Sequence, residues 1–95
     1  MTTLTRLQRW YSNYCNGVWE HSHGVKIDTL DNPGWSCIIS LAGTPLENQD
    51  FVAVHIECSE NDWMILSATS SEFKIHCGPK NLEESLTIFC DWAQV

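Results

Sequence analysis

The first segment of the chain carries its apolar residues at helical spacing. Between Leu4 and Tyr14 the apolar and aromatic side chains recur every three or four positions, which places them on one face of a helix. Thr3 or Thr5 can serve as the N-cap, and Asn16-Gly17 follows as a stop signal. A helix is therefore predicted for this segment.

The middle of the chain is patterned for strands. Apolar and polar residues alternate with a period of two, or apolar residues run continuously, between turn signals such as Asp31-Asn32-Pro33-Gly34 and Ser59-Glu60-Asn61-Asp62. The strands predicted in this way are Val25–Thr29, Trp35–Ala42, Phe51–Cys58, Trp63–Thr69 and Glu72–Cys77. Trp35–Ala42 is apolar on both faces, which favours a central position in the sheet.

A second helix is predicted at the end of the chain. Asn81 is suited to the N-cap, Glu83 and Glu84 follow in the first turn, and an apolar stripe runs on to Ala93. The order of helix, strands, helix with short connections indicates an α+β fold. We expect one domain over residues 1–95, with an antiparallel sheet of about five strands and both helices packed on one face.

Charge restricts the kinds of partner. The formal net charge is −7, from 12 acidic and five basic residues, and such a chain repels phosphate backbones and anionic lipids. Nucleic acid and membranes are therefore disfavoured as partners. No Lys or Arg occurs between Lys26 and Lys74, where eight carboxylates fall. That stretch is suited to attract a basic partner, although an acidic face that only keeps the protein soluble explains it equally well.

The termini and cysteines indicate a cytoplasmic protein. The first residues lack the basic and apolar segments of a signal peptide. Five scattered cysteines with no Cys-x-x-Cys spacing argue against a disulfide framework and predict mostly reduced, buried thiols. No cofactor motif is present.

The segment from Trp19 to Gly24 is the main candidate for chemistry. Glu20 beside His21 resembles an acid–base pair, but neighbours in an extended segment point to opposite sides, so no dyad forms without a third group. His21 and His23 project to the same side, and a cysteine could complete a metal site, yet the spacing matches no zinc module. We therefore predict neither catalysis nor metal binding, and keep a small enzyme or metal-binding protein centred on these histidines as the alternative.

Five tryptophans are many for so short a chain, and each must be buried or used in a contact. Trp10 and Trp92 are expected to pack the helices onto the sheet. If Val52, Val54 and Ile56 line the covered face, the other face still carries bulky residues, either from Trp35 and Ile39 or from Trp63 and Ile65. An uncovered apolar face edged by carboxylates is typical of a protein-binding surface; the alternative is that loops cover it.

Several motifs along the chain form a recognisable pattern. The specific signatures are Trp19-Glu20-His21 and the run from Leu30 to Trp35, which reads Leu-Asp-Asn-Pro-Gly-Trp. The other stretches are Leu7-x-x-Trp10-Tyr11, Cys15-x-Gly17-x-Trp19, the glycine at Gly24, and Asn81-Leu82-x-x-Ser85-Leu86-x-x-Phe89-x-x-Trp92. Together these motifs resemble the immunity protein 53 family, and the resemblance covers nearly the whole chain. His23 and the apolar stretch Phe51–Glu57 depart from the family pattern and bear on which toxin is recognised.

The resemblance implies a non-enzymatic bacterial protein, encoded beside a polymorphic toxin, that protects the producing cell by binding that toxin. The acidic charge fits a basic toxin, because opposite charge raises the association rate. We predict the contact residues from the character of their side chains and not from the family. They are Trp19, Glu20, His21, Asp28, Asp31, Trp35, Glu57 and Glu60.

Overall fold

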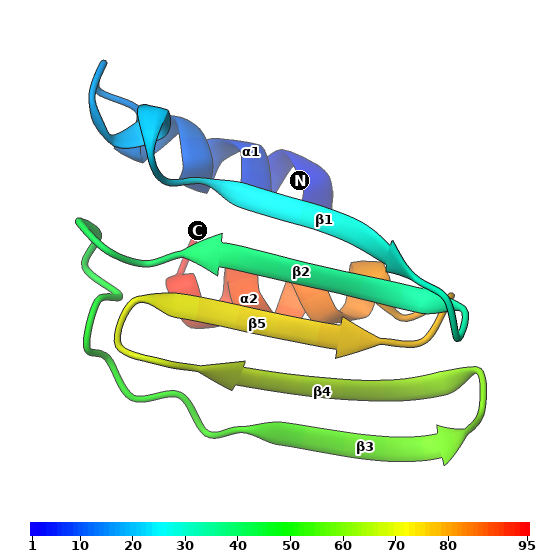
Figure 1. Ribbon diagram of the computed structural model, residues 1–95. Helices are drawn as coiled ribbons and strands as arrows, with labels where there is room; N and C mark the ends of the chain where they lie inside the picture. The colour runs from blue at the N-terminus through cyan, green and yellow to red at the C-terminus, as the bar shows by residue number, and fades with distance from the viewer.

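The computed structural model describes all residues, 1–95. Two α-helices enclose the strands in sequence, and a short 3-10 turn follows the first helix. Figure 1 shows these elements from the side of the sheet that faces away from the helices. Their bounds are α1 Thr3–Tyr14, η1 Trp19–His21, β1 Val25–Leu30, β2 Gly34–Ser40, β3 Val54–Ser59, β4 Asp62–Ala68, β5 Glu72–Cys77 and α2 Leu82–Ala93.

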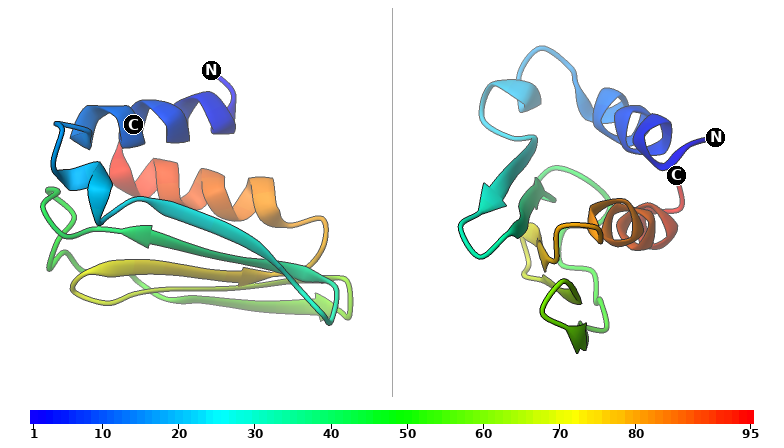
Figure 2. Two further views of the ribbon diagram at one scale, coloured as in Figure 1. Left: turned by 45° about the horizontal axis from the view of Figure 1, so that its top comes forward. Right: turned by 90° about the vertical axis from the view of Figure 1, so that its right-hand side faces the viewer.

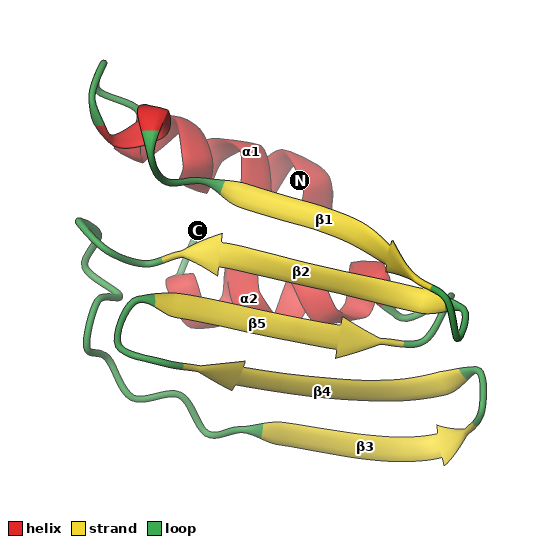
Figure 3. Ribbon diagram, viewed as in Figure 1, coloured by secondary structure: helices red, strands yellow, loops and turns green.

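The strands form one antiparallel sheet in the order β1-β2-β5-β4-β3. The predicted α+β class with five antiparallel strands is confirmed. As expected from its apolar pattern, β2 lies inside the sheet, where Cys37 and Ile39 are completely buried. The long connection from β2 to β3 runs along one end of the sheet and makes β3 an edge strand (Figure 3).

Both helices lie on the same side of the sheet, as predicted, but only α2 lies directly against it. Figure 2 shows α1 running alongside α2 rather than across the strands. Trp10 accordingly packs α1 onto α2: its ring lies 5.1 Å from that of Phe89. Trp92 does contact the sheet, because its ring stacks on Phe73 of β5 at 5.5 Å.

An aromatic core joins these layers. Trp10 contacts Phe89, and Phe89 contacts Phe73 at 5.0 Å. Phe51 completes the group with its ring 4.8 Å from Phe73. Phe51 was predicted to begin the third strand, but β3 begins three residues later at Val54. The contact with Phe73 and Trp92 holds Phe51 in the core instead, because burial of an aromatic ring outweighs continued pairing at a sheet edge.

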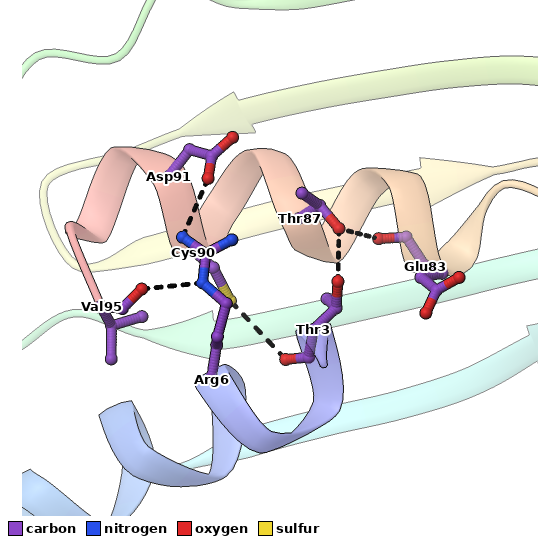
Figure 4. A network of polar contacts seen from close by, with 7 residues as sticks. All are labelled: Thr3, Arg6, Glu83, Thr87, Cys90, Asp91 and Val95. Atoms are coloured by element: carbon purple, nitrogen blue, oxygen red, sulfur yellow. Dashed lines mark hydrogen bonds and ion pairs between the residues drawn. The ribbon is translucent and has the colours of Figure 1, made fainter. Parts of the chain in front are cut away.

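Polar contacts fasten α1 to the end of the chain (Figure 4). The Arg6 guanidinium donates to the carboxylate of Asp91 at 2.9 Å and to the backbone carbonyl of Val95 at 2.8 Å. The hydroxyls of Thr3 and Thr87 meet at 2.6 Å. These bonds fix the C-terminus against the first helix. Neither helix has the length and apolar character needed to span a membrane.

Candidate functional site

The face of the sheet turned away from the helices, here called the open face, has no other segment in front of it (Figure 1). The strand register places Trp63 and Ile65 of β4 on this face, opposite the buried Met64 and Leu66. It places Trp35 and Ile39 on the covered side. Of the two sets of bulky residues considered for the open face, Trp63 and Ile65 are therefore the ones that occupy it.

A groove of about 780 Å³ lies at one end of the open face, and we call it the Trp63 groove. Asn32 and Pro33 from the β1–β2 turn line one side, and the β3–β4 hairpin from Glu57 to Asn61 lines the other. Trp63 and Ile65 lie between them. Segments far apart in the sequence meet here because the β1–β2 turn and the β3–β4 hairpin are at the same end of the sheet (Figure 1).

The glycine at position 34 leaves room for the Trp63 side chain. Gly78, in the chain after β5, is the neighbour of Trp63 and donates its backbone N–H to the Trp63 carbonyl at 2.9 Å. Gly34 of β2 comes next across the sheet, and the indole Cζ2 lies 3.4 Å from the position that a Cβ on Gly34 would take. Because Gly34 has no side chain, the half-buried indole can reach from β4 across β5 to β2.

The hairpin wall of the groove contains an irregularity. The register between β3 and β4 shifts between Glu57 and Ser59, and a bulge of this kind redirects the side chain of the extra residue. Cys58 thereby joins Glu57 in lining the groove. The Glu57 carboxylate also contacts the exposed His55 ring, with 2.8 Å between Oε1 and Nε2.

The charges that line the Trp63 groove are all negative. Glu57 and Glu60 are the only acidic residues that line the groove, and no Lys, Arg or His lines it. Asp28 projects from the open face of β1, and Asp31 lies in the exposed β1–β2 turn at the same end. The predicted residues Asp28, Asp31, Glu57 and Glu60 therefore all lie toward one end of the sheet, Asp28 on the β1 edge and Glu57 on the β3 edge.

The other predicted contacts lie elsewhere. The segment Trp19–His21 is at the opposite end of the sheet (Figure 1), and the six residues of β1 that intervene span roughly 20 Å. Trp35 is half-buried on the covered side, where its indole Nε1 donates to the Pro79 carbonyl at 3.0 Å. The single surface expected from the sequence is thus divided.

Trp19 is a core residue. Its side chain is only 7% exposed, and its indole Nε1 donates to the carbonyl oxygen of Ala42 at 2.7 Å. The ring of His23 stacks on the indole at 5.7 Å, which accounts for an imidazole at this position. An indole that is buried and hydrogen-bonded in this way serves the fold, because it has little surface left to offer to a partner.

Glu20 has a structural role beside it. Its carboxylate accepts the backbone N–H groups of Asn16 at 2.9 Å and Gly17 at 2.7 Å. Hydrogen bonds from backbone N–H groups, first its own and then those of Asn16 and Gly17, hold the pKa of Glu20 below its ordinary value. A carboxylate stabilised in its charged form and bound to the backbone is poorly suited to act as a general base.

The alternative of a catalytic or metal site at His21 and His23 finds no matching geometry. A cleft of about 670 Å³ between α1 and this segment does include Tyr11, Glu20, His21 and His23. No group of three or more His, Cys, Asp or Glu side chains is placed to hold a metal ion. Glu20 is engaged by the backbone and His23 by Trp19, so neither is free to form an acid–base pair with His21.

The sequence prediction missed the centre of the groove. It named Glu57, Glu60 and the turn that begins at Asp31 as contacts, but not Trp63. The alternation from Trp63 to Ile65 did indicate Trp63, because it gave these two residues as one of the two sets that could occupy the uncovered face. That the turn and the hairpin meet around Trp63 depends on the strand order, which local periodicity does not contain.

Comparison with known proteins adds the family. The model for immunity protein 53 matches residues 4–94. No curated protein and no solved structure matches the chain.

Proposed function

The chain belongs to the immunity protein 53 family, and on that premise we propose that it neutralises a cognate bacterial toxin by binding it directly through the Trp63 groove. Immunity proteins as a group protect against toxins and are generally not enzymes. Direct binding needs an accessible surface with an apolar centre and a polar rim. The Trp63 groove, in which a half-buried tryptophan is flanked by carboxylates, is the observation that carries the proposal.

The proposed surface consists of Trp63 with Asp28, Asp31, Glu57 and Glu60. An aromatic residue at the centre of an interface commonly supplies much of the binding energy, because a partner can desolvate its large surface completely. The surrounding carboxylates are exposed, so they act mainly on the rate of association and on its dependence on salt. Trp19 is left out because it is buried.

The charge of the chain supports a basic toxin as the partner. A net charge of −7 on 95 residues attracts a positively charged protein over distances up to about a Debye length, roughly 8–10 Å at physiological ionic strength. Toxins that act on nucleic acids carry positive charge for that purpose. An acidic inhibitor of such a toxin can bind the same basic surface that contacts the nucleic acid.

A binding experiment tests whether the chain neutralises the toxin by binding it directly. The toxin domain encoded by the neighbouring gene, inactivated by mutation, is purified and mixed with the full chain. We expect a complex that co-elutes in size-exclusion chromatography, and we expect co-expression of the chain to restore growth of cells that produce the active toxin. Growth restored without complex formation would contradict neutralisation by direct binding.

A second experiment tests the surface. We expect replacement of Asp28, Asp31, Glu57 and Glu60 by their amides to lower the association rate with the toxin about tenfold or more at low salt, and to reduce the salt dependence. The matched control replaces the same number of carboxylates away from the groove, at Glu47, Asp50, Glu72 and Glu83. Equal losses in the two sets would assign the effect to net charge and would overturn the proposed location.

A further inference from the structure

We propose that the Trp63 groove receives one arginine side chain of the toxin, with the guanidinium plane lying on the Trp63 indole and its N–H groups bonded to Glu57 and Glu60. The inference rests on the proposed function and specifies the chemistry of the partner at that surface. It derives from three features of the groove, which are an aromatic platform, a carboxylate wall and the absence of any positive charge among the lining residues.

The platform is the Trp63 indole. Tryptophan has the most negative face of the aromatic side chains, and a cation placed over that face is attracted to it. The absence of a side chain at Gly34 lets the indole extend across the sheet as far as β2, and Trp63 also lines the groove. Of the five tryptophans, Trp63 is the one that the strand register places on the open face.

The carboxylate wall stands beside this platform. Glu57 is the cross-strand partner of Trp63 on the open face, and Glu60 lies in the turn that follows. Directly opposite residues in antiparallel strands have Cβ atoms about 4.5–5.5 Å apart, and both side chains line the same groove, so a cation at the β4 end of the indole can reach the Glu57 carboxylate. His55 contacts only Oε1 of Glu57, which leaves Oε2 free to accept a bond.

Arginine fits this arrangement better than lysine. The guanidinium is planar, so it can stack on the indole while its edge N–H groups point outward to carboxylate oxygens. The lysine ammonium is a compact, strongly hydrated charge that can neither stack nor form a bidentate pair. The groove, at about 780 Å³, has room for the arginine side chain together with adjoining backbone, to which Asn32, Ser59 and Asn61 can offer hydrogen bonds.

A peptide titration tests the inference without the toxin. The uniformly ¹⁵N-labelled full chain is titrated with an acetylated and amidated Gly-Arg-Gly tripeptide, and the indole N–H resonance of Trp63 is followed. The Trp63→Phe variant assigns that resonance. Two further tripeptides serve as comparisons. Gly-citrulline-Gly has nearly the same shape as the arginine tripeptide but no charge, and Gly-Lys-Gly keeps the charge without the planar guanidinium. We expect a saturable shift with the arginine tripeptide, a smaller one with lysine and none with citrulline.

Variants on the wall provide the matched comparison. Glu57→Gln together with Glu60→Gln changes only exposed side chains, so folding is preserved, and we expect the arginine-induced shift to fall at least about fivefold. Glu72→Gln, at the other end of the open face, should leave it unchanged. The proposal is overturned if the arginine tripeptide leaves the Trp63 resonance in place, or if the citrulline tripeptide shifts it as much as the arginine tripeptide does. It is also overturned if Glu72→Gln reduces the shift as much as the Glu57→Gln, Glu60→Gln double variant does.

The inactive toxin then shows whether the same chemistry operates in the complex. We expect Trp63→Leu, which keeps the residue apolar, to weaken toxin binding about tenfold or more, and Trp63→Phe, which keeps an aromatic face, to weaken it less. Toxin that binds wild type and both variants equally would overturn the arginine receptor and the central place of Trp63 in the interface, while neutralisation by direct binding would still stand. Toxin that does not bind the wild type would refute the proposed function, whereas the peptide result would be unaffected.

Discussion

The Asn81 side chain accepts a hydrogen bond from the backbone N–H of Trp63, with 3.3 Å between Oδ1 and the nitrogen. Asn81 was predicted to cap α2, and it does occupy the N-cap position, but its side chain makes no capping bond to the helix. It reaches instead to the start of β4, where its Nδ2 also donates to Asp62 at 3.0 Å. One buried amide thus joins the beginning of α2 to the strand that carries the Trp63 groove.

We expect Asn81→Ala to lower the free energy of unfolding by about 1–3 kcal/mol, because it leaves partners of a buried amide without their bonds. Asn81 is only 5% exposed, so water cannot readily replace it. Urea denaturation followed by circular dichroism measures the change. The neighbouring exposed residue gives the control: Lys80→Ala should change stability by no more than about 0.5 kcal/mol, and equal effects would contradict the role assigned to Asn81.

Removal of two buried hydroxyls should have opposite effects on stability. The Ser85 hydroxyl has no partner beyond the weak one offered by the Cys77 thiol, whereas that of Thr44 donates to the Leu41 carbonyl at 2.7 Å. Removal of the poorly paired hydroxyl in Ser85→Ala should leave stability unchanged or raise it by up to about 1 kcal/mol, since alanine also favours the helix. Thr44→Val should cost about 1–3 kcal/mol. Chemical denaturation of both variants decides, and a destabilised Ser85→Ala would indicate a bonded hydroxyl.

The lowered pKa of Glu20 predicts a pH-dependent contribution to stability. Because hydrogen bonds to backbone N–H groups favour the ionised form in the folded state, the contribution is complete above the ordinary value of 4.5 and is lost as the pH falls through the lowered pKa. Glu20→Gln should therefore lower Tm near neutral pH, and its Tm should converge with that of wild type in acid. Glu47→Gln, an exposed position, serves as control. A Tm difference independent of pH would contradict this.

The thiols should react in a fixed order. Burial raises the pKa of Cys37 to about 12 and also raises those of Cys77 and Cys90, so these remain protonated and inaccessible at neutral pH. Cys58 is exposed, whereas Cys15 is half-buried and its thiol donates to the Tyr11 carbonyl at 3.3 Å. Intact-mass analysis during iodoacetamide treatment should show one fast addition, at Cys58. Fast labelling of Cys37 in the folded protein would contradict the buried core.

The elements themselves follow from local pattern. The helical stripe after Leu4, the alternation in the strands and the turn at Asp31–Gly34 each involve residues close in sequence. Their physical basis, side-chain spacing of 3.6 or two residues and the backbone preferences of Pro and Gly, acts over a few residues. Both helices, all five strands and the inner position of β2 could therefore be predicted, and the family resemblance could be as well.

The position of Trp19 could not be predicted in this way. An irregular segment has no periodicity that tells which side chains turn inward, and Trp19 is buried because Trp10, on α1, meets it at 6.1 Å. The same applies to Phe51, which leaves the expected strand to contact Phe73. In both cases the partner comes from another element, and the burial of large aromatic surfaces decides the local conformation.

The sequence by itself determined the fold class, the acidic charge and the carboxylates at Asp28, Asp31, Glu57 and Glu60. Only the tertiary structure decided that these carboxylates share one end of the sheet and that Trp63 lies among them. The reason is the pairing of β2 with β5 and of β5 with β4, long-range contacts that bring Gly34 of β2 within reach of Trp63 and leave space for the indole. Strand order depends on how the helices and the aromatic core pack together, and that energy is summed over residues distant in sequence.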